Sequence, residues 1–142
     1  MHINVASPRR SVEVRLFLVE DLQTTHDLLE AVFASLGGLR LVGTEGTEAE
    51  ANLWLLEHPG AWDIALIDLV LAQGSGMSVI RRARELHPPG KVAVFSAYAS
   101  PAVCTHCLGL GADVVFSKAD TGEFVSWLCE QRGPPPAHAG HA

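Results

Sequence analysis

The sequence has little positive charge, few cysteines and no long apolar run, and each shortage argues against a class of protein. Ten lysines and arginines stand against sixteen aspartates and glutamates, which gives a formal net charge of -6. This acidic balance argues against direct binding of nucleic acid. Three cysteines are an odd number in a chain without an export signal, so we expect reduced thiols rather than disulfides. No apolar stretch approaches the roughly 20 residues of a membrane-spanning helix.

The remaining composition is that of a packed globular domain. The chain has 142 residues, of which 48% are hydrophobic and 18% charged. The first residues, MHINVASPRRS, lack the apolar core of a signal peptide, so we expect a cytoplasmic location and no membrane partner. We predict a flexible N-terminal tail over 1–11, one domain over 12–132, and a disordered tail over 133–142, whose sequence GPPPAHAGHA is rich in proline and glycine.

Apolar segments and helical patterns alternate strictly along the predicted domain. The expected strands are 12–20, 39–46, 62–68, 91–97 and 113–118, and the expected helices are 21–38, 47–60, 76–90, 100–112 and 119–132. The strand segments are continuously apolar, which indicates a parallel sheet covered on both faces. The sequence therefore predicts an α/β fold, a doubly wound five-stranded sheet of order 2-1-3-4-5. The first helix is predicted from the helical spacing of its apolar residues, which Gly37 and Gly38 end; these residues are Leu22, Leu28, Leu29, Val32, Phe33 and Leu36.

Chemically active side chains stand at the carboxyl ends of these strands, where ligands bind in such sheets. Three of them are acids: Glu20 and Asp21 follow the first strand and Asp68 ends the third. Converging carboxylates repel one another, and a hard divalent cation such as Mg²⁺ relieves that repulsion. Ser96 and Lys118 end the fourth and fifth strands, and both side chains can hold a phosphoryl group.

Together these residues resemble the receiver domain of two-component response regulators. The resemblance covers roughly residues 12 to 132 and is carried by LFLVED, LIDLVLAQGSG, VFSA and GADVVFSK, in that order along the chain. Gly76 follows Asp68 by 8 residues and Lys118 follows Ser96 by 22 residues, as in the family pattern.

The resemblance implies a signalling switch rather than an enzyme acting on other molecules. Asp68 would take a phosphoryl group from a sensor histidine kinase, a histidine phosphotransfer protein or a small acyl phosphate, and the domain would catalyse its own phosphorylation and dephosphorylation. Mg²⁺ would be bound by Asp21, by Glu20 through water, by Asp68, and by the backbone carbonyl of Val70. The phosphoryl group would lie against Ser96, Ala97 and Lys118. An unidentified downstream protein, or a second copy of the chain, would bind the face formed by the fourth helix, fifth strand and fifth helix.

Five positions depart from the family pattern. Ala72 stands where a proline is usual, and Ala119 stands where a proline often follows the lysine directly. Val115 stands where an aromatic ring usually turns inward on activation. Val70 and Tyr98, two residues past Asp68 and Ser96, are poorly suited to position an attacking water. We therefore predict a long-lived phosphoryl group.

Several other interpretations of the sequence compete with this one. The fold could serve as an unphosphorylated pseudo-receiver that only binds proteins, or as a phosphatase or nucleotide binder, although no GxxxxGK loop and no DxD pair after the first strand is present. Cys104 and Cys107 form a CxxC pair on a predicted helix with no second ligand pair, so we interpret them as packed thiols.

The remaining conspicuous side chains have structural interpretations. We interpret Arg81, Arg82 and Arg84 as a solvated helix face. We interpret the three tryptophans Trp54, Trp62 and Trp127 as core or helix-packing residues.

Overall fold

A computed structural model describes residues 13–132, which form one five-stranded parallel sheet with five helices. The strands are β1 (Val14–Val19), β2 (Leu39–Glu45), β3 (Ile64–Ile67), β4 (Lys91–Ser96) and β5 (Val114–Ser117). The helices are α2 (Gln23–Leu36), α3 (Glu48–Glu57), α4 (Gly76–Leu86), α5 (Pro101–Leu110) and α6 (Thr121–Gln131). The strand order β2-β1-β3-β4-β5 confirms the predicted topology. The two predicted tails lie outside the described residues.

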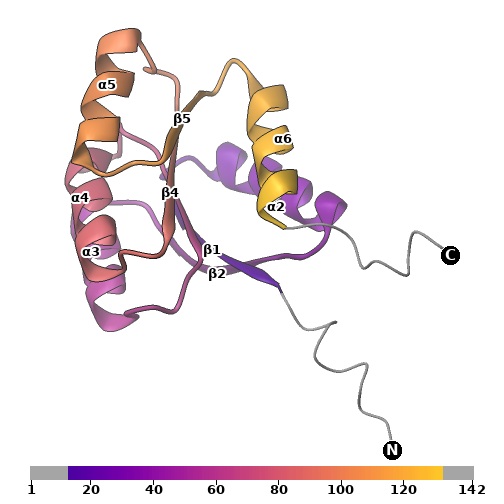
Figure 1. Ribbon diagram of the computed structural model, residues 1–142, viewed down its shortest axis with the longest axis horizontal. Coiled ribbons are helices and arrows are strands. Elements are labelled where there is room, and N and C mark those ends of the chain that lie inside the picture. The colour runs from indigo at the N-terminus through magenta and orange to yellow at the C-terminus, as the bar shows by residue number, and fades with distance from the viewer. Residues whose placement is uncertain (1–12, 133–142) are drawn as a thin grey trace, which may run out of the picture.

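The helices cover both faces of the sheet, which makes three layers. Figure 1 shows α3, α4 and α5 on one side and α2 and α6 on the other. Helices are needed on both faces because the side chains of strand β1 alternate between two apolar clusters, one on each face of the sheet. Phe17 and Val19 pack with α3, α4 and α5, whereas Leu16 and Leu18 pack with α2 and α6. A strand buried on both faces reads as a continuous apolar run.

Three tryptophans support these two layers, as predicted. Trp54 of α3 stacks on Phe17 of β1 with ring centroids 4.0 Å apart, and the absence of a side chain at Gly43 makes room for its indole. Trp62 is fully buried in the same cluster, and Trp127 packs in the opposite one. The Trp54 stack therefore holds helix α3 against the sheet.

Most helices begin at a capping side chain that satisfies an amide left unpaired at the helix start. Thr47, Ser75, Ser100 and Asp120 each accept a backbone N–H of the first turn of α3, α4, α5 and α6, respectively. Helix α2 differs, because Leu22 at its N-cap has no side-chain acceptor. No helix between residues 13 and 132 combines the length and apolar character needed to cross a membrane.

The helix predicted from this apolar spacing is confirmed as α2, but not all of the apolar residues face the core. Leu29 and Phe33 are buried and Val32 and Leu36 are partly buried, whereas Leu22 and Leu28 are both more than half exposed. Leu22 precedes the helix. Leu28 is adjacent to buried Leu29, and the 100° turn per residue carries it off the sheet-facing side.

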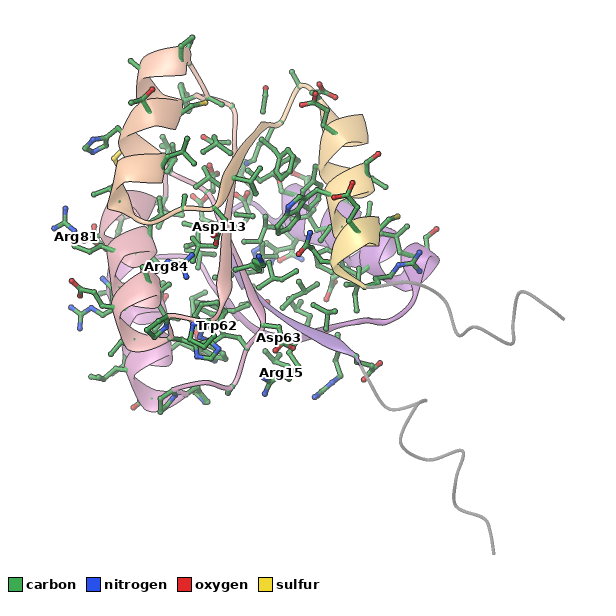
Figure 2. The ribbon with its side chains drawn as sticks, in the orientation of Figure 1. Arg15, Trp62, Asp63, Arg81, Arg84 and Asp113 are labelled. Atoms are coloured by element: carbon green, nitrogen blue, oxygen red, sulfur yellow. The ribbon has the colours of Figure 1, made fainter. Side chains whose placement is uncertain are left out.

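The solvated arginine face predicted on α4 was wrong for one residue. Arg81 and Arg82 are exposed, but Arg84 is half-buried and donates hydrogen bonds to the carbonyls of Gly111 and Gly90 and to the Asp113 carboxylate. Figure 2 shows Arg81 pointing away from the sheet and Arg84 turned inward toward Asp113. Arg84 follows Ile80 by one helical turn, at the border of the buried face, so its long side chain reaches the loops at the amino ends of the strands.

A second ion pair closes the same edge of the sheet. Arg15 of β1 donates to both carboxylate oxygens of Asp63, with distances of 3.0 Å from Nε to Oδ2 and 3.0 Å from Nη2 to Oδ1. The two side chains lie together in Figure 2. The Arg15 guanidinium, which donates hydrogen bonds to the Asp63 carboxyl, holds the pKa of that carboxyl below its usual range despite partial burial. The amino edge of the sheet is therefore occupied by structural ion pairs.

Candidate functional site

The side chains predicted to stand at the carboxyl ends of the strands lie together at one edge of the sheet, the carboxyl edge. Val19 of β1 lies opposite Ile67 of β3 in the parallel register. The residues that directly follow them, Glu20 and Asp68, therefore leave adjacent strands at the same height. Lys118 follows β5, and its backbone N–H donates to the Ser96 carbonyl at 3.0 Å, which ties the ends of β4 and β5 together.

Lys118 is the centre of this arrangement. Its ammonium donates to Glu20 Oε1 at 2.8 Å and to Asp68 Oδ2 at 2.9 Å, so one cation joins two carboxylates from two other strand ends. Both acids are buried, Glu20 with 1% and Asp68 with 7% of its surface exposed. Buried carboxylates are costly unless they are paired and hydrogen-bonded. Lys118 thus explains how an acid can end the apolar strand β3.

Burial and hydrogen bonding shift the pKa values of both Glu20 and Lys118. Burial raises the pKa of Glu20, and the hydrogen bond from Lys118 only partly offsets that rise. Burial would lower the pKa of Lys118, but the hydrogen bonds to Glu20 and Asp68 outweigh it and hold the pKa above its ordinary value. Lys118 is consequently a stable cation at neutral pH.

One ammonium does not neutralise the acids of this pocket. Glu20, Asp21 and Asp68 each offer a carboxylate oxygen, and these oxygens lie within 4.8 Å of one another. Hard oxygen donors gathered this closely suit a divalent cation such as Mg²⁺, which takes a few carboxylates and keeps several waters. The three acids therefore fit the predicted metal. Among the described residues no other group of three acidic, histidine or cysteine side chains gathers in this way.

The remaining predicted residues lie at the same edge in different surroundings. Ser96 is fully buried, and its hydroxyl oxygen accepts the Tyr98 N–H at 3.1 Å. Ala97, the next residue, is exposed. The Val70 side chain is 54% exposed, and the role predicted for its backbone carbonyl stays a prediction. Val115 is half-buried and packs against the core cluster beneath α4 and α5.

The loop after Asp68 is folded tightly against this residue. Asp68 Oδ1 accepts the N–H of Leu69 at 2.8 Å, and the carbonyl of Leu69 accepts the N–H of Gly76 at 2.9 Å. A Cβ atom at Gly76 would lie 2.0 Å from the Asp68 carbonyl oxygen. Glycine is required at this position because the start of α4 packs directly on the Asp68 backbone.

Sequence reasoning missed one residue near the site, Glu48. Its carboxylate accepts one hydrogen bond from the loop that follows Asp68 and one from the first turn of α4. In the sequence, however, it is simply an acid in the first turn of a helix, where the helix dipole favours any acid. The two cysteines of the CxxC pair lie where packed thiols are expected. Cys107 is buried in the core cluster and Cys104 is half-buried.

Comparison with known proteins gives concordant results. The family profile described as the response regulator receiver domain matches residues 16–127. The transcriptional regulatory protein DltR of Streptococcus agalactiae is 30% identical over 108 residues, which make up 74% of this chain and 45% of DltR. The chain thus spans less than half the length of the curated relatives it matches.

Solved structures share the same fold. The signal receiver domain of the response regulator NarL from Mycobacterium tuberculosis superposes with a TM-score of 0.72 at 25% identity, covering 87% of this chain and 98% of that one. A response regulator from Burkholderia pseudomallei with a phosphorylated aspartic acid and a calcium ion gives a TM-score of 0.66 at 20% identity, covering 85% of this chain and 74% of that one.

Proposed function

Because the chain belongs to the response regulator receiver domain family, we propose that Asp68 accepts a phosphoryl group in a Mg²⁺-dependent reaction and thereby switches a protein-binding surface. The observation that carries this proposal is the Lys118 ammonium, held 2.9 Å from Asp68 and 2.8 Å from Glu20 beside three gathered carboxylates. The arrangement pairs a nucleophilic carboxylate with fixed positive charge, which is what phosphoryl transfer needs.

The reaction transfers one phosphoryl group and needs no other reactant. A carboxylate oxygen of Asp68 attacks the phosphorus of a phosphohistidine, the P–N bond breaks, and the imidazole nitrogen keeps the electron pair and takes a proton. Asp21, Asp68, the Val70 carbonyl and, through water, Glu20 would hold Mg²⁺. The bound ion would neutralise charge on the phosphoryl oxygens. Lys118 supplies a second, fixed cation, 2.9 Å from Asp68 Oδ2. Positioning and charge neutralisation provide most of the catalysis in such transfers.

Ser96 and Ala97 complete the phosphoryl pocket in this proposal. The N–H of Tyr98 uses one lone pair of the Ser96 hydroxyl, which leaves the hydroxyl proton available for a phosphoryl oxygen. Ala97 is exposed and small, so it leaves room beside that hydroxyl. A new hydrogen bond at Ser96 would pull on the turn that leads into α5. This movement would be the change between two conformations by which phosphorylation alters the protein-binding surface.

The partners follow from the same chemistry. The phosphoryl donor would be a sensor histidine kinase or a histidine phosphotransfer protein in the cytoplasm, and the output surface would be the face of α5, β5 and α6. A downstream protein or a second copy of the chain would bind there.

Intact mass spectrometry after incubation with acetyl phosphate and Mg²⁺ tests the proposal. We expect the wild type to gain the mass of one phosphoryl group and Asp68→Asn to gain none. Asp27→Asn is the matched control, because Asp27 is exposed on α2 and its conversion to the amide removes the same charge. No adduct on the wild type, or an adduct that persists in Asp68→Asn, would contradict the proposal. The first result would favour the pseudo-receiver interpretation.

A further inference from the structure

A second set of contacts, outside the acidic pocket, holds the loop of residues 69–75 that follows Asp68. Glu48 opens α3 and extends its carboxylate over this loop. Its Oε1 accepts the N–H of Ser75 at 2.8 Å, and its Oε2 accepts the hydroxyl of Ser78 at 2.6 Å. Its own N–H donates to the Gln73 carbonyl at 3.0 Å. One residue of α3 therefore joins both the loop and the first turn of α4; we name the contacts of Glu48 with Ser75 and Ser78 the Glu48 clasp.

Two glycines let the loop fit between Glu48 and Asp68. Gly74 has φ of +89°, and a Cβ atom there would lie 2.5 Å from both Cβ and Oε1 of Glu48. On the other side, a Cβ atom at Gly76 would meet the Asp68 carbonyl oxygen at 2.0 Å. The C-terminal end of the loop is thus packed between Glu48 on one side and the Asp68 backbone on the other, so a shift of one side is transmitted to the other.

The clasp is itself held in place by a neighbour on α3. Ser78 accepts the side-chain N–H of Asn52 at 3.2 Å while it donates to Glu48. The hydrogen bonds from Ser78 and from the Ser75 N–H keep the pKa of Glu48 below its ordinary value, so the carboxylate is ionised at neutral pH. Because Trp54 packs α3 on the sheet, the clasp ties the loop to a helix that is itself held against the core.

We propose that Glu48 is a positioning residue for Asp68, acting through the loop rather than by contact with the reacting atoms. This inference rests on the proposed phosphorylation of Asp68. Loss of the clasp would leave Ser75 and the turn at Gly76 free to shift, and with them the Asp68 backbone. Misplacement of a reacting group by about 1 Å can cost on the order of 10²-fold in rate.

Phosphorylation by acetyl phosphate, with its rate followed by intact mass at several Mg²⁺ concentrations, tests this role. We expect Glu48→Ala to lower the maximal rate constant by at least about tenfold and to leave the half-saturating Mg²⁺ concentration unchanged, because the three acids stay in place. Glu48→Gln should restore most of the rate, since the amide can accept from Ser75 and donate to Ser78. Glu57→Ala, an exposed acid on the same helix, should match the wild type.

Amide NMR on the unphosphorylated protein separates this inference from the proposed function. Glu48→Ala should remove the exchange protection of the Ser75 N–H and shift the resonance of the Leu69 N–H, which donates to Asp68 Oδ1; Glu48→Gln should keep both. An unreactive wild type would defeat the proposed function while these two amides still report on the clasp. Wild-type rates in Glu48→Ala, no rescue by Glu48→Gln, or an unmoved Leu69 resonance would overturn the positioning role.

Discussion

Lys118 and Asp68 are joined by a hydrogen bond of 2.9 Å although 50 residues separate them in the chain. The bond exists because β3 and β5 end at the same edge of the sheet, with β4 between them. It gives a buried carboxylate its counter-ion and places a cation where phosphoryl oxygens would lie. The same bond therefore serves folding and the proposed chemistry, and removing the lysine should affect both.

Lys118→Met should slow phosphorylation of Asp68 by acetyl phosphate by roughly 10²-fold, the usual effect of removing one charge-stabilising donor. The proposed Mg²⁺ site keeps its three acids, so some reaction should remain. Without the lysine, Glu20 loses its cationic partner, and burial should then favour its protonated form. The measurement is the rate of adduct formation by intact mass, with Lys91→Met at the opposite edge as control. Equal rates in the two variants would show that Lys118 has no part in the transfer.

Mg²⁺ should stabilise the folded protein, and this effect should require Asp21. A ligand that binds only the folded state at about 100 times its Kd adds about 2.7 kcal/mol to the free energy of unfolding. We expect thermal unfolding of the wild type to move to higher temperature with added Mg²⁺, and that of Asp21→Asn to move much less. A shift of the same size in Asp21→Asn would place the cation elsewhere. Asp27→Asn, on the exposed side of α2, should respond as the wild type does.

The sequence was sufficient to predict the sheet order and the gathering of Glu20, Asp21, Asp68 and Lys118, because parallel strands bring their carboxyl ends to one edge. It was insufficient for Glu48, whose role depends on how closely α3 approaches the loop over Gly74. The error at Arg84 has a similar cause, since a run of arginines on a helix does not reveal which one borders the buried face. Such contacts between a helix and a loop depend on three-dimensional packing rather than on periodicity.

Arg84 should contribute far more to stability than its neighbour Arg81. Arg84→Ala removes the donors to Gly90, Gly111 and Asp113 and should lower the free energy of unfolding by about 2 kcal/mol. Arg81→Ala, at an exposed position on the same helix, should change it by less than about 0.5 kcal/mol. Urea unfolding followed by tryptophan fluorescence measures both. Similar losses in the two variants would mean that the bonds of Arg84 add no net stability.

The ion pair of Arg15 and Asp63 should make stability depend on pH on the acid side. The pKa of Asp63 is lower in the folded protein than its ordinary value, so its contribution is fully present above the unfolded-state pKa and disappears as pH falls through the folded-state pKa. Both side chains are more than a third exposed, 36% and 41%, so solvent limits the effect to about 1 kcal/mol or less. Asp63→Asn should be less stable than wild type at pH 7 and equal to it near pH 2. A difference between the two proteins that stays constant with pH would contradict this account.

The lifetime of the phosphoryl group should depend on Val70 and Tyr98, which stand two residues past Asp68 and Ser96. Val70 and Tyr98 are 54% and 62% exposed, so both face the solvent from which a hydrolytic water must come, and neither is suited to orient that water. Val70→Asn combined with Tyr98→Glu supplies an amide and a carboxylate at these positions and should shorten the half-life of the phosphorylated protein by about tenfold or more, as a positioned acid–base group does. The decay is measured by intact mass after removal of acetyl phosphate. Leu108→Asn, an exposed apolar position on α5, is the control and should leave the half-life unchanged. An unchanged half-life in the double variant would show that access of water is controlled elsewhere in the pocket.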